Sequence, residues 1–323
     1  MVRYLVTGGS GFIGTHLVDA LLARGDTVAN LDIAAPKKDE HRAYWHELDL
    51  MDAAGVKQLC DDFRPDVIVN LAAVADLSIP LEAMAVNWVG VENLLKATAE
   101  WPTKPRLVHT STQLVVGAGF VADHPRDYHP YTPYGESKAL SEEVLWNWPG
   151  DIEWAVIRPC LVWGSHYPGF AKATWYYLQK RWYLIPSRNS AVKTFSYVGN
   201  LVDQFIAAAT LPADEVNHRI FYGGDCNLDS AVWLDAFARA LTGKRARRVP
   251  YAALQAIALA GDLSGKIGGP SPINSGRLFR MTQDYPNPVE ETHRALGKPR
   301  HTMEEGVAST VKWLREAYPE RFA

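Results

Sequence analysis

Short apolar runs alternate with longer helical patterns through the first half of this chain, and this alternation limits the possible folds more than any other feature. Five runs read as strands: RYLVT (3–7), TVANLD (27–32), DVIVNLA (66–72), RLVHTST (106–112) and WAVIRP (154–159). Four of them are almost continuously apolar, as strands buried on both faces of a parallel sheet are. Helical patterns such as 12–24 and 80–100 lie between them. The alternation predicts βαβ units and an α/β fold with a doubly wound parallel sheet.

The pattern changes after about residue 164, where aromatic residues become frequent and the alternation ends. We expect residues 1–164 and 196–222 to form the sheet domain. Residues 165–195 and 223–323 are expected to form a smaller, discontinuous C-terminal lobe that binds the substrate. The apolar stretch YAALQAIALAG (251–261) is too short to span a bilayer, and we expect a buried or groove-lining helix there.

Composition narrows the class of protein. The chain has 323 residues, of which 47% are hydrophobic, enough for one large or two ordinary globular domains. The formal net charge is −3, so we expect no nucleic-acid partner. The three cysteines are scattered, which indicates neither a disulfide framework nor a zinc site. No signal-peptide pattern follows Met1, so we expect a soluble cytoplasmic protein with no membrane partner.

A glycine-rich turn, VTGGSGFIG (6–14), follows the first strand directly and opens the first helix. Gly8, Gly11 and Gly14 permit a tight turn, close approach of a pyrophosphate and tight packing of helix on strand. The helix that begins with Phe12 and Ile13 then directs its N-terminus at the phosphates. In this context the turn predicts a Rossmann-type dinucleotide site.

Asp32 ends the second predicted strand, 18 residues after Gly14. A carboxylate there accepts hydrogen bonds from the adenosine ribose hydroxyls and repels a 2′-phosphate. The nearest basic residues in the sequence are Lys37 and Lys38, and none adjoins Asp32. NAD is therefore predicted as the cofactor in preference to NADP.

The segment PYTPYGESK (130–138) contains a predicted helix start at Pro133, because proline is favoured in the first turn of a helix. Tyr134 and Lys138 then lie four residues apart on one helix face, whereas Tyr131 lies upstream of it. An ammonium beside a phenol lowers the phenol pKa, which makes Tyr134 a candidate acid or base near neutral pH. A tyrosine and a lysine at this spacing also occur on ordinary solvated helices, so the other motifs must show whether Tyr134 has a catalytic role.

Those motifs resemble the extended short-chain dehydrogenases/reductases, in the branch of NAD-dependent nucleotide-sugar epimerases and dehydratases. The resemblance covers residues 1–211 and, more loosely, 270–317. Its motifs, in family order, are TGGSGFIG (7–14), LDL (48–50), NLAA (70–73), VNWVGVENLL (86–95), HTSTQLVVG (109–117), PYGESK (133–138), IRPCLVWG (157–164) and FSYVGNLVD (195–203). The resemblance implies that Tyr134 is the catalytic tyrosine.

The resemblance also implies roles for other residues. Thr112 occupies the position that hydrogen-bonds the substrate oxygen, and Lys138 would hold the nicotinamide ribose and lower the Tyr134 pKa. Asn87 matches an asparagine that organises the site. A polar helix residue whose hydrogen bonds are satisfied within the fold would give the same sequence pattern. The remaining residues expected to contact the cofactor are Asp49 and Leu50 beside the adenine, Leu71, Ala72 and Ala73 along the trough, and Pro159 near the nicotinamide.

Departures from the family pattern limit the reaction. The similar 4,6-dehydratases carry Asp-Glu after the threonine, whereas Gln113 and Leu114 stand here and neither transfers a proton. Thr112, Tyr134 and Lys138 suffice for hydride and proton transfer at one carbinol carbon. We therefore expect a nucleotide-sugar 4-epimerase or 4-ketoreductase, acting as the homodimer that the family resemblance implies.

Two alternatives remain open. Leu161 and an aromatic group fit an apolar substrate, as in the hydroxysteroid dehydrogenases and dihydroflavonol reductases that the chain also resembles. That group is Trp163, Trp175, Tyr176, Tyr177 and Trp182, which could equally be core. Arg277 and Arg280 suit a diphosphate instead. The second alternative is a non-catalytic NAD(H)-binding regulatory protein, against which the intact Thr112, Tyr134 and Lys138 argue.

Overall fold

The structure is a computed structural model that describes residues 1–120, 122–188, 190–266 and 273–322. The chain divides into two compact units, and each unit is assembled from three separate segments of the sequence. Unit 1 comprises Met1–Val162, Val198–Asp225 and Pro288–Arg300. Unit 2 comprises Trp163–Tyr197, Cys226–Asn287 and His301–Ala323.

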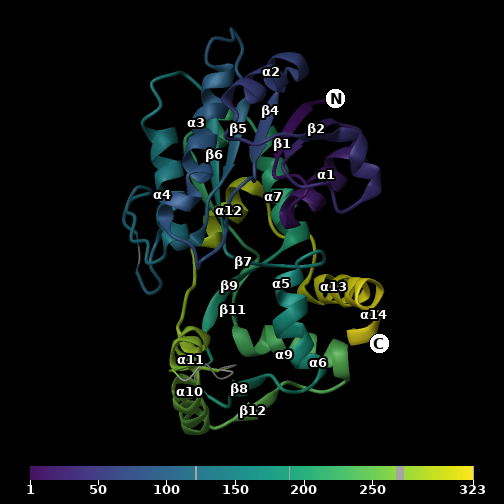
Figure 1. Cartoon of the computed structure of the whole chain (residues 1–323), viewed down its shortest axis with the longest axis vertical. Helices are drawn as coiled ribbons and strands as arrows, with labels where there is room; N and C mark the ends of the chain where they lie inside the picture. Colours follow the sequence, from purple (N-terminus) through teal and green to yellow (C-terminus); the bar gives the residue numbers. More distant parts are fainter. Residues whose placement is uncertain (121, 189, 267–272, 323) are drawn as a thin grey trace. The chain divides into compact units, whose positions relative to one another are not determined.

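Unit 1 is built on a seven-stranded parallel sheet with the order β10-β6-β5-β4-β1-β2-β3 (Figure 1). Its strands are β1 (Arg3–Thr7), β2 (Thr27–Asp32), β3 (Trp45–Glu47), β4 (Val67–Asn70), β5 (Arg106–Thr110), β6 (Trp154–Pro159) and β10 (Arg219–Gly223). The strand order changes direction between β1 and β4, and such a switch point opens a crevice at the carboxyl ends of the strands. The predicted α/β fold with a doubly wound parallel sheet is confirmed.

Helices cover both faces of this sheet because successive side chains of its strands point to opposite faces. Tyr4 and Val6 of β1 pack with α1 (Phe12–Ala23) and α7 (Val198–Thr210). Leu5 packs in the other cluster, which includes residues of α2 (Ala53–Phe63), α3 (Val86–Thr98) and α4 (Pro133–Trp146). The short helix α8 (Ala213–Val216) precedes β10. The core of unit 1 therefore lies in two layers, one on each side of the sheet.

The main difference from the predicted domains is that residues 288–300 belong to unit 1 and not to the smaller lobe; the other boundaries lie within three residues of the predicted ones. Residues 288–300 contain α12 (Val289–Leu296), whose Leu296 joins the core on the α1 and α7 side. His293 and Glu291 of this helix bond to the Gly224 carbonyl and to Arg219, next to β10. These contacts are made by a late segment, which nothing in the strand–helix alternation marks as part of the sheet domain.

Unit 2 has small sheets and more irregular connections. Its strands are β7 (Leu161–Trp163, entering from unit 1), β8 (Leu184–Pro186), β9 (Val192–Tyr197), β11 (Cys226–Asp229) and β12 (Arg247–Val249). They pair in the orders β11-β9-β7 and β12-β8. Its helices are α5 (Pro168–Phe170), α6 (Tyr176–Gln179), α9 (Ser230–Thr242), α10 (Tyr251–Lys266), α11 (Ser275–Thr282), α13 (Met303–Ala317) and α14 (Pro319–Phe322). None of the described helices is long and apolar enough to cross a membrane.

The helix predicted at 251–261 is present and is only partly buried, and its Ile257 lines a pocket of unit 2, so the groove-lining alternative fits better than the buried one. That stretch forms most of α10, in which only Leu254, Ala258 and Gly261 are buried. A run of alanines and leucines predicts a helix, but it does not say how many of its sides are covered.

Candidate active site

The turn between β1 and α1 brings its glycines into contacts that larger residues would not fit. Gly8 has φ +70°, and a Cβ there would lie 2.7 Å from the Ala72 nitrogen. A Cβ on Gly14 would overlap the Gly8 carbonyl oxygen. Gly11 offers no side-chain cap to α1, whose first residues are Phe12 and Ile13, so the N-terminus can receive an anionic group. This geometry fits the predicted pyrophosphate site.

Asp32 lies at the carboxyl end of β2 and is tied to the glycine-rich turn. Its Oδ2 accepts a hydrogen bond from the Ser10 amide at 3.0 Å, and its Oδ1 accepts one from the Ala34 amide at 2.9 Å. Lys37 reaches the same place, because its Nζ donates to the Ser10 carbonyl at 3.0 Å. Burial lowers the pKa of Lys37, against the opposing charge of Asp32. Lys37 was predicted not to adjoin Asp32, but the loop after β2 folds back and brings it to the same turn.

The adenine pair predicted at Asp49 and Leu50 follows β3. The Asp49 carboxylate accepts from the Met51 amide at 2.9 Å, so its side chain is held by its own turn. Leu50 is buried, and its carbonyl accepts from the Asn93 side chain of α3 at 2.9 Å. The Asn93 side chain therefore fixes the backbone at Leu50; it lies in the motif 86–95, from which no role was inferred for it.

The trough residues Leu71, Ala72 and Ala73 follow β4 beside the glycine-rich turn. The Leu71 amide donates to the Thr7 carbonyl at 3.0 Å, and the Ala72 amide donates to the Thr7 hydroxyl at 3.2 Å. The next residue, Val74, bonds to the Asn87 side chain through both its amide and its carbonyl, at 2.8 and 3.0 Å. The end of the trough is thus fixed to α3.

Asn87 extends this connection to α4. Its amide donates to the Ser137 hydroxyl at 2.8 Å, and Ser137 donates to the Tyr134 carbonyl at 2.8 Å. The side chain is 1% exposed. The buried Asn87 amide thus joins the predicted trough, at Val74, to α4, the helix that carries the candidate acid or base. These contacts agree with the organising role expected for Asn87.

Helix α4 begins at Pro133, as predicted, because the Thr132 hydroxyl caps it by accepting from the Gly135 amide at 3.0 Å. Tyr134 and Lys138 therefore lie one turn apart on this helix. Lys138 is 1% exposed, whereas Tyr131 lies outside the helix and is 56% exposed. The local structure thus distinguishes the two tyrosines of the motif.

Thr112 follows β5 and is brought close to α4 by a second glycine contact. Its hydroxyl accepts from the Leu114 amide at 3.3 Å and caps the turn Gln113–Val115. A Cβ on Gly135 would overlap the Leu114 carbonyl oxygen. Gly135 therefore allows the Thr112 turn to contact the first turn of α4, so Thr112 and Tyr134 lie on adjoining segments.

The protonation of this pair differs from the expectation. Although part of the Tyr134 side chain is exposed, burial raises its pKa to about 12. Burial also lowers the pKa of Lys138 to about 7, against the opposing effect of the Glu142 carboxylate. In the protein alone Lys138 therefore does not lower the Tyr134 pKa. The reason is that removal from water disfavours the charged form of each group.

A chain of buried hydrogen bonds runs behind the site. The Thr7 hydroxyl donates to Asn70 at 2.5 Å, and the Asn70 amide lies 3.1 Å from His109 Nδ1. His109 Nε2 lies 2.9 Å from the Ser141 hydroxyl, which donates to the Lys138 carbonyl at 2.6 Å. Burial, with Lys138 nearby, holds the His109 pKa well below its usual value. A neutral histidine therefore links β1, β4, β5 and α4. The sequence analysis did not single out His109, although a histidine within an otherwise apolar strand could have indicated a buried hydrogen-bonding role.

A buried ion pair joins α4 to β6. Arg158 donates to both Glu142 carboxylate oxygens, at 2.9 and 2.7 Å, and also to the Pro125 carbonyl and the Tyr222 hydroxyl. Tyr128 donates to Glu142 at 3.1 Å. Glu142 is 0% and Arg158 1% exposed. The next residue, Pro159, ends β6 at the carboxyl edge of the sheet, where the nicotinamide contact was predicted.

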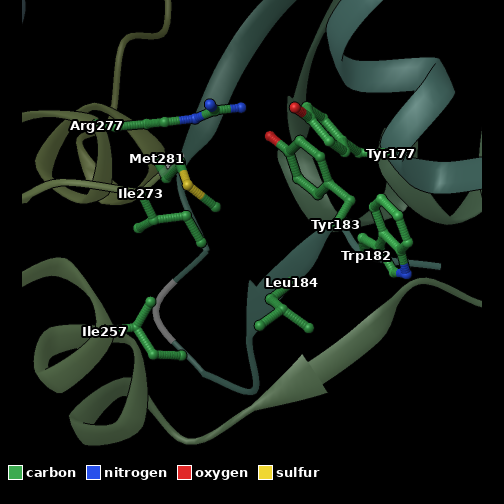
Figure 2. A pocket seen from close by; sticks show the side chains of 8 residues that line it. All are labelled: Tyr177, Trp182, Tyr183, Leu184, Ile257, Ile273, Arg277 and Met281. Carbon is green, nitrogen blue, oxygen red and sulfur yellow. The ribbon is translucent and has the colours of Figure 1, made fainter. Parts of the chain in front are cut away.

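The residues predicted in unit 2 do not gather in one place, and Tyr176 belongs neither to the core nor to the pocket lining but packs against Tyr177. Trp163 and Trp175 are core residues packed on Phe237. A pocket of about 270 Å³ is lined by Tyr177, Trp182, Tyr183, Leu184, Ile257, Ile273, Arg277 and Met281 (Figure 2). Arg277 points toward the tyrosine hydroxyls of this pocket (Figure 2), and it hydrogen-bonds Tyr183. Arg280 is exposed and does not line the pocket, so the two arginines do not form one diphosphate clamp there.

Comparison with known proteins places this site in a family. The model of the NAD dependent epimerase/dehydratase family matches residues 4–222. The 3 beta-hydroxysteroid dehydrogenase/Delta 5-->4-isomerase of Mycobacterium tuberculosis is 32% identical over 222 residues, which are 64% of this chain and 60% of that protein. The N-acetyl-alpha-D-glucosaminyl-diphospho-ditrans,octacis-undecaprenol 4-epimerase of Escherichia coli O157:H7 is 29% identical over 212 residues, covering 62% of this chain and 60% of that protein.

A solved structure matches nearly the whole chain. The UDP-glucose 4-epimerase of Thermus thermophilus, in complex with NAD, superposes with a TM-score of 0.71 and 26% identity. The match covers 98% of this chain and 99% of that one. The match to the family model spans the glycine-rich turn, Asp32, Thr112, Tyr134 and Lys138. The chain is therefore an NAD-dependent enzyme that belongs to the NAD dependent epimerase/dehydratase family.

Proposed function

We propose that this enzyme moves a hydride and a proton at one secondary carbinol or keto carbon, with Tyr134 as the acid or base. The observation that carries the proposal is the contact of the Thr112 turn with the first turn of α4 at Gly135. Thr112 therefore lies on the segment next to the one that carries Tyr134, and Gln113 and Leu114 follow where an eliminating enzyme needs an acid and a base.

The residues present fit NAD, since a Cβ-free turn, an open helix N-terminus and Asp32 meet at the crevice of the sheet. When bound, NAD supplies the hydride acceptor or donor. In the oxidative direction the phenolate form of Tyr134 would take the proton of the carbinol hydroxyl while the carbinol hydrogen leaves as hydride. Because burial raises the Tyr134 pKa in the protein alone, Tyr134 must first lose its own proton to solvent. Thr112 would orient the substrate oxygen, and Lys138 would hold the nicotinamide ribose. In the reductive direction Tyr134 returns the proton to the oxygen.

The favoured substrate is a nucleotide-sugar, and the favoured reactions are 4-epimerisation and 4-keto reduction. This choice is supported by the full-length match to the T. thermophilus enzyme, named a UDP-glucose 4-epimerase. In an epimerisation the hydride returns to the opposite face of the same carbon, so Thr112 and Tyr134 serve both half-reactions and no further proton carrier is required.

A second candidate is an apolar alcohol or ketone, such as a hydroxysteroid. The unit 2 pocket favours it, because its lining is aliphatic and aromatic apart from Arg277 and the tyrosine hydroxyls. The mycobacterial relative is named a hydroxysteroid dehydrogenase, and Leu161 fits an apolar group. The E. coli relative is named for a sugar joined to a polyprenol diphosphate, which combines both chemistries in one molecule.

The test is incubation with a panel of UDP- and dTDP-sugars, a polyprenyl-diphosphate sugar and hydroxysteroids, with added NAD or NADH. Proton NMR would read the configuration at the carbinol carbon, and absorbance would read NADH. We expect C4 inversion or reduction of a sugar, and loss of turnover in Tyr134→Phe with NAD binding kept. Turnover of a steroid alone would select the second candidate. Tight NAD binding with no turnover of any class would support the non-catalytic alternative.

A further inference from the structure

The outer side of α10 is an exposed apolar surface. Ala252, Ala256, Leu259 and Leu263 follow the spacing i, i+4, i+7, i+11, so they lie along one side of the helix. All four are exposed, and the exposed fractions of Leu259 and Leu263 are 65% and 66%. We call these four residues the outer stripe. A contiguous exposed apolar surface marks a site of protein or membrane interaction, whereas single exposed apolar residues are ordinary.

The opposite side of α10 is anchored, so the outer stripe has a fixed direction. Leu254 and Ala258 are buried against Leu278 of α11, together with Leu184 and Val249. Figure 1 draws α10 and α11 side by side, as this cluster requires. Phe279, the next residue of α11, is 60% exposed. The apolar surface is therefore a rigid feature of unit 2.

A basic cluster leads directly into this helix. Residues 236–261 contain no acidic residue and five basic ones: Arg239, Lys244, Arg245, Arg247 and Arg248. Arg248 pairs with Asp235 at 3.0 Å, and Arg245 lies 4.0 Å from the same carboxylate. One buried acid cannot neutralise the group, and Lys244, Arg245, Arg247 and Arg248 are exposed. The net charge of the whole chain, −3, does not reveal this local excess of positive charge, because acidic residues elsewhere outweigh it.

An exposed tryptophan lies beside the cluster. Strand β12 pairs with β8, with Arg247 opposite Leu184. Trp182 stands two residues before Leu184 and is 63% exposed, next to the exposed Lys180 and the partly exposed Arg181. Tryptophan is enriched where protein meets the polar boundary of a bilayer, because its ring is apolar and its N–H is polar. Apolar, basic and interfacial residues thus meet at one end of unit 2.

We propose that unit 2 docks on an anionic lipid surface through the outer stripe of α10 and the basic cluster at 244–248. Stable attachment to a membrane needs two signals, and an inserted apolar helix side with adjacent positive charge supplies both. The sequence analysis expected no membrane partner because the stretch is too short to span a bilayer. Docking does not need a spanning segment, because such a helix lies in the interface plane.

The unit 2 pocket supports a lipid over a protein partner. Ile257 of α10 and Trp182 both line this pocket, and both are exposed, by 40% and 63% (Figure 2). Ile257 lies on another side of α10 than the outer stripe, so the pocket borders the docking surface and is not part of it. A membrane on the docking surface could deliver an apolar ligand to the bordering pocket, whereas a protein partner holds no such ligand.

The test is cosedimentation of the full-length protein with phosphatidylcholine vesicles, with and without phosphatidylglycerol. We expect binding to the anionic vesicles that weakens as salt is added. Leu259→Gln with Leu263→Gln should weaken it about tenfold or more, because two leucines no longer insert. Arg245→Gln with Arg247→Gln should weaken it about fivefold per arginine. Leu77→Gln in unit 1 and Lys312→Gln on α13 are matched controls that should bind like the wild type.

Three outcomes would overturn the proposal. The first is no binding to anionic vesicles. The second is binding that the leucine pair does not change, since the outer stripe would then be irrelevant. The third is a self-association that only the leucine pair abolishes, without vesicle binding, because a second copy of the chain would then cover the stripe. Circular dichroism of each variant checks that a loss of binding is not a loss of fold.

Discussion

At the scale of single residues, Tyr131 and Tyr134 are close in sequence, but only Tyr134 is placed for a chemical role. The two lie three residues apart, but only Tyr134 follows the Thr132 cap and shares a helix with Lys138. Local hydrogen bonding was therefore sufficient to select the candidate, because a capped helix start fixes which side chains share a face.

Phenylalanine at position 134 should abolish most of the turnover while leaving the cofactor site intact. Tyr134→Phe keeps the ring and removes the proton carrier, so we expect kcat to fall by about 10² to 10⁴. NAD affinity, measured by titration calorimetry, should barely change. Tyr131→Phe is the matched control and should behave like the wild type. Equal damage from both substitutions would contradict the assignment of Tyr134.

Asp32 and Lys37 should have opposite effects on the choice between NAD and NADP. Asp32→Asn removes the charge that repels a 2′-phosphate and leaves Lys37 in place, so NADP binding should improve by roughly tenfold. Lys37→Gln should leave Asp32 unopposed and weaken NADP binding further. Titration of both cofactors into each variant measures this. Equal affinity of the wild type for NADP and NAD would show that Asp32 does not discriminate.

Lys138 should destabilise the cofactor-free protein in a pH-dependent way. Its folded pKa, about 7, is below its ordinary value of 10.5, so the unfolded chain binds more protons between these limits. The free energy of unfolding should therefore rise with pH across this window. Lys138→Met should remove that rise and stabilise the protein near neutral pH by a few kcal/mol. Urea titrations at pH 6.5 and pH 9 test it, and the same variant should bind NAD more weakly.

Some site residues could be read from the sequence, and others could not. Gly8, Asp32 and Tyr134 could be proposed from the sequence because each sits at a fixed distance from a strand end or helix start, and Thr112 was proposed from the family resemblance. Lys37, Asn93 and His109 depend on how distant segments fold back, and a motif in one stretch carries no information about that. Their contacts join residues 10 and 37, 50 and 93, and 70, 109 and 141.

At the scale of elements, long apolar strands were predicted well and short or exposed ones were not. The runs 3–7, 27–32 and 154–159 match β1, β2 and β6 to the residue. β3 has three residues and little burial, so it carries no periodic signal. β10 was missed because it lies in a region that lacks alternation, and it forms only by pairing with β6. Both β3 and β10 are stabilised by pairing with a neighbouring strand, and a local sequence pattern does not predict such tertiary pairing.

Removing one partner of the buried ion pair between α4 and β6 should strongly destabilise the protein, because the other charge is left buried without compensation. Glu142→Gln keeps the shape but leaves Arg158 buried beside a neutral partner, and a broken buried pair typically costs about 3 to 5 kcal/mol. Thermal unfolding should show a clear drop in Tm. The surface pair of Lys96 and Glu92 is the control, and Glu92→Gln should change stability by less than about 1 kcal/mol. Equal effects would mean that burial adds nothing to the pair.

At the scale of the whole molecule, α3 and α4 should form a homodimer interface, as the family resemblance implies. Leu140 of α4 is 38% exposed, and Trp88 and Val89 of α3 are partly exposed. We expect a dimer in sedimentation at micromolar concentration, and Leu140→Asp should convert it to a monomer. Leu77→Asp, at an exposed position outside both helices, should not. A monomeric wild type would contradict the prediction.

The division of each unit into three segments sets the order in which a ribosome can complete them. The sheet of unit 1 lacks its edge strand β10 until Gly223 has been synthesised, and α12 follows only after the first two segments of unit 2. Domains normally fold as units in N-terminal order during synthesis, but here neither unit precedes the other. A nascent chain therefore carries an unfinished sheet for most of its translation. Truncation before Pro288 removes part of both units, so neither can be produced by cutting the gene once.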